Sequence, residues 1–379
     1  MPEGGGPIQV FESVCEDPYR VAREAAAGGR SVAGYLCTYT PEELFHAAGY
    51  FPVRIFGRNK GATYHADAHL PSFACGFLRS VLDMALAGEL DFLEVVVFPH
   101  TCDTMQNLAE IWKHSVARIP SITITTPVSV GTESAVRYFS EEIRRARKAL
   151  EETVGEVSDS LLMKSIALYG AHRERMHRLY EVRRAHPERL SGRQMMATVI
   201  ASLLMPREEH LPHLDALLAE LGGVSGQTGD DRPTVFVVGN TCHNLDYVSM
   251  IEDAGCVVVE DDLCSGYRAF AMAARDERDP IDRLARMYLV GTSCPTKHQP
   301  GWDTGKDLVE KAQALPAEGV VFLLTKFCEP WGFDYPHLKE AFEGAGLPTL
   351  LAAIECNQPP GESFRGRISA FIEMLQTKS

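Results

Sequence analysis

Short apolar runs recur along the chain, and a polar turn and a helical pattern follow most of them. The clearest runs cover residues 94–98, 234–238, 256–260, 319–325 and 349–354. They are rich in β-branched residues and show no polar alternation, which is typical of strands covered on both faces. Strands that alternate with helices form parallel, doubly wound sheets, so the pattern predicts an α/β fold.

The pattern changes in the middle of the chain. Residues 138–182 and 192–221 have apolar positions at helical spacing, and residues 222–231 (GGVSGQTGDD) read as a linker. We therefore predict an N-terminal helical arm (1–30), a first α/β lobe (31–135), a helical connecting region (136–225) and a second α/β lobe (226–379). The lobes are expected to be flavodoxin- or Rossmann-like parallel sheets with a cleft between them.

Cysteines gather at the ends of the predicted strands. Five of the ten follow a strand directly, and a sixth lies between a short strand and a helix start: Cys102, Cys242, Cys264, Cys328, Cys356 and Cys37. Thiols on one rim indicate a site for a soft metal. No Cys-x-x-Cys pair or ferredoxin-type run occurs, so ligands to a cluster would come from distant parts of the chain. Disulfide frameworks belong to small secreted domains, which disfavours that alternative.

Charge and composition narrow the class of protein. The formal net charge of -14 provides no basic surplus for nucleic acid or an anionic membrane. We find no signal peptide and no apolar run that could cross a bilayer, and we expect a cytoplasmic protein. No Walker-type phosphate loop occurs, so this chain is not expected to hydrolyse ATP.

Several longer motifs together resemble one known family. In the first half they are GYLCTYTPEELFHAAGYFPVRIFG, HLPSFACGFLRS and TCDTMQNLAEIWKH. In the second half they are IEDAGCVVVEDDLCSGYR, DPIDRLARMYL and GVVFLLTKFCEPWGFDYPHLKEAFEGAGLP. Over nearly its whole length the chain resembles the benzoyl-CoA reductase/2-hydroxyacyl-CoA dehydratase family.

The resemblance implies an iron–sulfur protein. Such subunits hold a [4Fe–4S] cubane through three cysteines between two flavodoxin-like lobes, and a separate ATP-hydrolysing activator supplies electrons. Carried over by motif, the ligands here are Cys75, Cys102 and Cys328. A branch of the family holds a double-cubane cluster through six thiolates, which would add Cys37, Cys264 and Cys294. In the other reading, Cys37 and Cys264 are merely buried and Cys294 is a loop thiol.

Three functions follow from the resemblance. The first is the iron–sulfur catalytic subunit of an ATP-coupled reductase, most like a benzoyl-CoA reductase subunit or a double-cubane reductase, acting on an acyl-CoA or small substrate. The second is a subunit of an (R)-2-hydroxyacyl-CoA dehydratase, which works through a ketyl radical. The third is a non-catalytic electron relay. All three imply a homologous partner subunit, in a homo- or heterodimer.

Some charged and polar residues have simpler interpretations. Arg54, Arg268 and Lys297 could contact a CoA phosphate or a partner, but we interpret them as solvated charges. Asp103 is interpreted as a helix cap, and Pro99 is expected to end its strand.

Overall fold

The strands form two four-stranded sheets in the computed structural model, which describes residues 5–222, 231–272, 275–290, 294–355 and 358–377. The first sheet contains β1 (Val32–Tyr35), β2 (Phe51–Arg54), β3 (Val95–His100) and β4 (Ser121–Thr125). The second contains β5 (Thr234–Gly239), β6 (Val257–Asp262), β7 (Gly319–Thr325) and β8 (Thr349–Ile354). Every pairing between neighbouring strands is parallel, which confirms the predicted α/β class.

Both sheets have the same strand order. The first reads β2-β1-β3-β4 and the second β6-β5-β7-β8, which is the flavodoxin-like arrangement. The order reverses between β1 and β3, and again between β5 and β7. Open α/β sheets bind ligands outside the carboxyl ends of the strands at such switch points.

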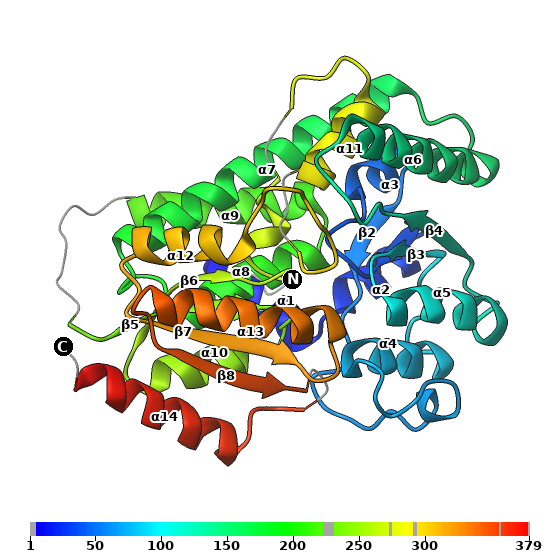
Figure 1. The fold of residues 1–379 in the computed structure, drawn as a ribbon. Coiled ribbons are helices and arrows are strands. Elements are labelled where there is room, and N and C mark those ends of the chain that lie inside the picture. Colours follow the sequence, from blue (N-terminus) through cyan, green and yellow to red (C-terminus); the bar gives the residue numbers. More distant parts are fainter. Residues whose placement is uncertain (1–4, 223–230, 273–274, 291–293, 356–357, 378–379) are drawn as a thin grey trace.

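Helices cover the sheets and join the two halves (Figure 1). In the first half they are α1 (Pro7–Glu16), α2 (Arg20–Ala27), α3 (Glu42–Ala47), α4 (Gly76–Leu86) and α5 (Asp103–Ser115). The connecting helices are α6 (Glu133–Val154), α7 (Asp159–Ala185), α8 (Gly192–Leu204) and α9 (Arg207–Gly222). In the second half they are α10 (Leu245–Asp253), α11 (Pro280–Val290), α12 (Thr304–Ala314), α13 (Glu329–Gly344) and α14 (Glu362–Gln376).

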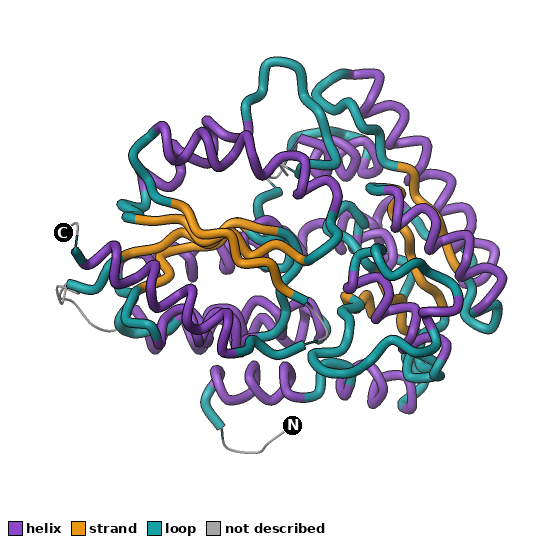
Figure 2. Tube along the Cα trace, turned by 60° about the horizontal axis from the view of Figure 1, so that its bottom comes forward, coloured by secondary structure: helices purple, strands orange, loops and turns teal. Residues whose placement is uncertain are grey.

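The two sheets lie apart (Figure 2), and α8 contacts β2 of the first sheet and β6 of the second. Most residues of α8 are buried, and the helix packs against α1, α10, β2 and β6. A helix that is apolar on nearly all sides belongs to the interior of a large core. One core cluster accordingly includes residues of both sheets and of α8. The predicted domain boundaries remain a prediction, and residues 223–230 of the expected linker lie outside the described residues.

The strand β3 continues through Pro99 to His100, so the predicted end at Pro99 is wrong. The N–H of Val96 donates toward the β4 side, and residues of a strand alternate between its two neighbours. The nitrogen of Pro99 therefore faces the β1 side. Pairing with β1 already ends at Val97, so the missing N–H costs no ladder hydrogen bond.

Buried ion pairs tie the short helix α3 to the helices that connect the lobes. Glu43 is fully buried, and its carboxylate accepts from Arg173 Nη1 at 2.7 Å and from the Tyr288 hydroxyl at 2.7 Å. Glu42 pairs with Arg207 at 2.8 Å. These contacts join α3 to α7, α9 and α11, and they fix the end of the loop that leaves β1.

Neutral histidines are buried in the same region. His172 Nε2 lies 3.1 Å from His210 Nδ1, and His210 Nε2 lies 3.1 Å from the carbonyl oxygen of Thr198. Burial lowers the pKa of His172 well below its usual value and that of His210 to about 3. Burial also lowers the pKa of His243, which stacks on Phe56, to about 4.

We expect these three histidines to make the protein acid-sensitive. The unfolded chain takes up their protons near pH 6.5 while the folded chain does not, so stability is fully present above that pH and falls as the pH drops toward 4. Each contributes about 1.4 kcal/mol per pH unit within that window. Urea unfolding between pH 7 and pH 5 should show this slope. It should persist in the control His114→Gln, whose histidine is exposed; a flat profile would contradict the prediction.

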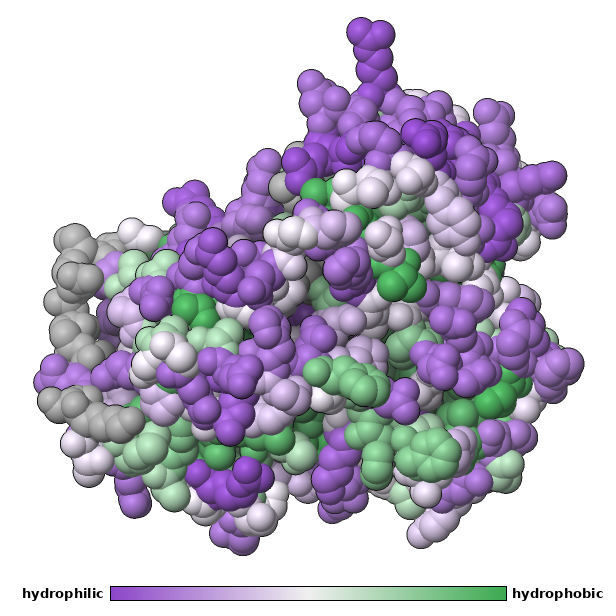
Figure 3. Space-filling model, viewed as in Figure 1, coloured by the Kyte–Doolittle hydropathy of each residue, from purple (hydrophilic) through white to green (hydrophobic). Residues whose placement is uncertain are grey.

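Figure 3 shows the face of the molecule that is seen in Figure 1. The surface over the connecting helices is predominantly hydrophilic, and the lower half of this face carries more hydrophobic residues. None of the described helices is long and apolar enough to cross a membrane.

Candidate functional site

All six cysteines singled out from the motifs line one cavity of about 110 Å³. Cys37, Cys75 and Cys102 come from the first half of the chain. Cys264, Cys294 and Cys328 come from the second half. Residues that follow strands of both sheets line the cavity, so the carboxyl ends of the two sheets meet there.

Three of these cysteines begin helices. Cys75, Cys102 and Cys328 are the N-cap residues of α4, α5 and α13. The unsatisfied amides of a helix N-terminus carry partial positive charge, which favours thiolate nearby. Phe327 adopts a left-handed conformation (φ 61°), which an L residue other than glycine rarely adopts, and it turns the chain sharply from β7 into α13.

The other three cysteines lie in loops. The Thr101 hydroxyl is 3.9 Å from Cys37 Sγ, and the Thr296 hydroxyl is 3.3 Å from Cys294 Sγ. The Thr38 hydroxyl donates to the carbonyl oxygen of Cys264 at 2.9 Å, which links the two halves at the cavity wall.

Asp261 shapes the loop that carries Cys264. Its Oδ1 accepts from the backbone N–H groups of Leu263 at 3.0 Å and Tyr267 at 2.9 Å. A Cβ at Gly266 would lie only 1.8 Å from this oxygen, so the turn requires glycine there.

The remaining described cysteines have other surroundings. Cys15, Cys242 and Cys256 are buried in the core and do not line the cavity. The Cys256 thiol donates to the carbonyl oxygen of Ile251 at 3.1 Å. None of the nine described cysteines forms a disulfide. Cys356 lies outside the described residues.

Burial disfavours thiolates in the cavity. It raises the pKa of Cys102 to about 12 and that of Cys264 to about 11, and it also raises the pKa of Cys328. The backbone N–H of Met105 opposes this effect at Cys102, and the Asn240 side chain opposes it at Cys328. Thiolates here would therefore need strong positive charge in direct contact, such as metal ions.

The arrangement fits a multinuclear cluster better than a single metal ion. In the described part of the chain, no three His, Cys, Asp or Glu side chains are close enough together to hold one ion. A single zinc ion needs four ligands at about 2.3 Å or less, whereas a cluster takes thiolates on separate iron atoms around a larger body. Six thiols spread around one cavity match the ligands that a cluster needs on its separate iron atoms.

Two arginines also line the cavity, and the prediction that they are solvated is wrong. Arg54 is 2% exposed and Arg268 is 3% exposed. Asp103 is the first residue of α5, after the N-cap Cys102, so its prediction as the cap is also wrong. The helix begins one residue earlier than propensity indicates.

A second, more polar pocket of about 470 Å³ adjoins the cavity and shares Cys294 with it. Lys297, His298, Trp302 and His337 line this pocket. Lys297 Nζ donates to the Thr126 hydroxyl at 2.5 Å, and burial lowers the pKa of Lys297 to about 8. Lys297 is therefore half-buried rather than solvated.

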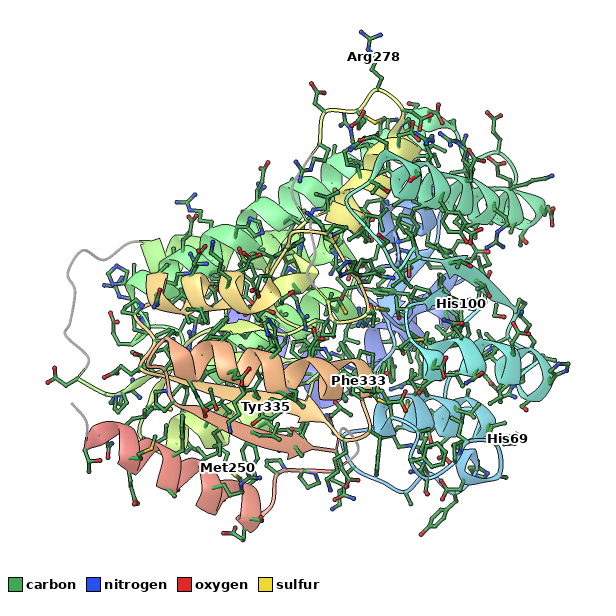
Figure 4. The ribbon with its side chains drawn as sticks, viewed as in Figure 1. His69, His100, Met250, Arg278, Phe333 and Tyr335 are labelled. Carbon is green, nitrogen blue, oxygen red and sulfur yellow. The ribbon has the colours of Figure 1, made fainter. Side chains whose placement is uncertain are left out.

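Sequence reasoning missed the polar and aromatic residues around the cysteines. Asn240 and Thr241 line the cavity from the loop after β5, and only the position of GNTCHN behind a buried strand could have indicated them. Phe73, Phe327 and Phe333 are exposed aromatic residues close in sequence to Cys75 or Cys328. Figure 4 places Phe333 near the N-terminal end of α13, toward the first lobe.

Comparisons with known proteins agree with this geometry. The family model described as 2-hydroxyglutaryl-CoA dehydratase, D-component, matches residues 37–375. The (R)-phenyllactyl-CoA dehydratase β subunit of Clostridium sporogenes is 28% identical over 96% of this chain and 97% of its own length. The lactoyl-CoA dehydratase β subunit of Anaerotignum propionicum is 29% identical over 92% of this chain and 93% of its own. A benzoyl-CoA reductase subunit of Thauera aromatica is 27% identical over 96% of this chain and 97% of its own.

The resemblance inferred from the motifs is thus confirmed over nearly the whole chain. These three proteins are named as subunits of enzymes that act on CoA thioesters. This chain belongs to the 2-hydroxyglutaryl-CoA dehydratase D-component family, which includes benzoyl-CoA reductase and 2-hydroxyacyl-CoA dehydratase subunits.

Proposed function

We propose that the chain is the iron–sulfur catalytic subunit of an ATP-coupled, low-potential reductase. The cysteine cavity would hold the cluster, and Cys75, Cys102 and Cys328 would be its ligands at the helix N-termini. When bound, the cluster supplies single electrons to an acyl-CoA or small substrate. A separate iron–sulfur activator hydrolyses ATP and reduces this subunit.

The observation that carries the proposal is that six cysteines, rather than three, line one cavity. Cys37, Cys264 and Cys294 share it with the three primary candidates, which favours the double-cubane reading over a single cubane. The polar pocket beside Cys294 would admit the substrate. Lys297 there offers positive charge, and His298 and His337 offer hydrogen bonds, to a thioester oxygen or a carboxylate.

A partner subunit is part of the proposal. The similar proteins are each named as one subunit of an enzyme. Exposed aromatic residues beside the cysteines, such as Phe333, would be covered by a homologous subunit in a homo- or heterodimer.

The names of the relatives also favour a second function, a subunit of an (R)-2-hydroxyacyl-CoA dehydratase that works through a ketyl radical. Both functions need the activator. A dehydratase recovers its electron after each turnover, whereas a reductase consumes electrons with every product. With saturating activator, ATP consumed in proportion to product would support the reductase, and many products per ATP would support the dehydratase.

Iron and acid-labile sulfide per chain test the proposal directly, on protein purified without oxygen. About eight irons per chain would support six ligands, and about four would support one cubane and leave the other three cysteines structural. Zinc, or no metal, would contradict the proposed function. If only a complex with a sister subunit binds acyl-CoA, the chain is better described as an electron relay.

A further inference from the structure

The cysteine cavity contains a buried cation that forms no ion pair with a carboxylate of the described residues. Arg54 is the last residue of β2 and lines the cavity. Arginine keeps its proton at any pH of interest, so the burial cost cannot be avoided by losing the charge. Such a charge is unfavourable in the interior unless an opposite charge lies beside it.

The hydrogen bonds of Arg54 do not supply that opposite charge. Its Nη1 donates to the neutral Thr38 hydroxyl at 3.4 Å, and its Nε is buried without a hydrogen-bond partner. The nearby carboxylates of Glu42 and Glu43 are engaged by Arg207 and Arg173.

Aromatic rings hold the guanidinium in place. Its central carbon lies 5.5 Å from the ring centroid of Tyr35 and 5.8 Å from that of Phe56. Such contacts favour a cation and restrict its movement, but they leave its full charge in the cavity.

Arg268, the other arginine of the cavity, has different partners. Its Nε lies 3.5 Å from Asp262 Oδ2, and its Nη2 donates to the carbonyl oxygen of Gly239. Two carboxylates, Asp103 and Glu329, also line the cavity, but both are exposed. Arg54 is therefore a buried charge of the lining that forms no ion pair with the described residues.

Arg54 shares the lining of the cavity with the six thiols. Thr38 connects Arg54 with Cys264, because its hydroxyl accepts from Arg54 and donates to the Cys264 carbonyl oxygen. A single side chain thus links Arg54 to the loop that carries one of the cavity cysteines.

We propose that Arg54 is a positioning residue that balances the negative charge of the thiolate-bound cluster and raises its reduction potential. The inference rests on the proposed function. A thiolate-ligated cluster becomes more negative by one unit when it accepts one electron from the activator. A fixed positive charge in a dry cavity stabilises the reduced form more than the oxidised form.

The test compares Arg54→Gln, which removes the charge, with Arg54→Lys, which retains it. Iron per chain, the rate of iron loss to a chelator and the midpoint potential from an EPR-monitored titration are measured in the purified protein and both variants. At a given potential, the ratio of reduced to oxidised cluster should be about tenfold lower in Arg54→Gln than in the parent protein. This corresponds to a midpoint potential about 59 mV more negative. Arg54→Gln should also lose iron faster, while Arg54→Lys should stay near the parent protein.

The outcomes separate the two proposals. An iron-loaded Arg54→Gln with an unchanged potential would overturn the inference and leave the proposed function intact. An unchanged potential with a raised KM would assign Arg54 to substrate binding instead, and would also overturn it. A parent protein without iron would overturn both. Equal shifts in Arg54→Gln and Arg54→Lys would indicate a packing effect rather than a charge effect and would contradict the inference.

Discussion

Replacing Cys102 or Cys328 with serine is expected to remove most of the bound iron and to lower activity roughly 100-fold or more. Loss of a residue that merely supports a metal ligand already costs 10–100-fold, and a direct ligand should cost at least as much. Both residues cap helices whose N-termini point at the cavity, so a serine hydroxyl fits the local backbone. The effect should therefore come from lost ligation and not from misfolding.

Iron content and activity are measured together, with Cys256→Ser as the matched control. Cys256 also forms no disulfide, but it is buried in the core and lies outside the cavity. It should retain full iron. Full iron in Cys102→Ser or Cys328→Ser would refute the ligand assignment.

The same substitution at the loop cysteines distinguishes the two cluster types. If the site holds a double cubane, Cys37→Ser, Cys264→Ser and Cys294→Ser should each lower the iron content. If the site holds one cubane, all three should keep about four irons per chain.

The second large effect is expected at the buried pair of Glu43 and Arg173. Replacing Glu43 with glutamine leaves Arg173 charged and without its carboxylate in the interior, which costs about 3–5 kcal/mol of folding free energy. Glutamine keeps the size of the side chain and an acceptor for the Tyr288 hydroxyl, so the loss reports mainly on charge.

Urea unfolding of Glu43→Gln, Arg173→Met and the double variant measures this effect. The double variant should recover much of the lost stability, because no unpaired charge remains. A loss below about 1 kcal/mol in Glu43→Gln would show that the pair behaves like a surface ion pair. Glu209→Gln on α9 is a suitable control, since Glu209 is exposed.

The sequence predicts the strands of this fold well, because strands buried on both faces need uninterrupted apolar runs. The predicted runs at residues 319–325 and 349–354 coincide with β7 and β8. The position of the cysteines at the strand ends was also predictable from the sequence, because the carboxyl ends of parallel strands lie at the same edge of a sheet.

Features that depend on which surfaces meet were not predictable. Arg54 looked like a solvated charge because nothing in PVRIFG shows that the second lobe closes over the end of β2. The strand β3 extends two residues further than expected, and α5 begins at Asp103 with Cys102 at the N-cap. The buried partners of Glu42 and Glu43 lie more than a hundred residues away, beyond any local pattern.

The division of the six cysteines between the two halves has a consequence for biosynthesis. The first lobe leaves the ribosome with Cys37, Cys75 and Cys102 on an open rim, and Cys328 follows roughly 10–50 s later at ordinary rates of translation. During that interval the exposed thiols face any oxidant or stray metal in the cell. On the proposed ligand set, the cluster can be inserted only into the finished chain, so maturation must wait for the whole polypeptide to fold.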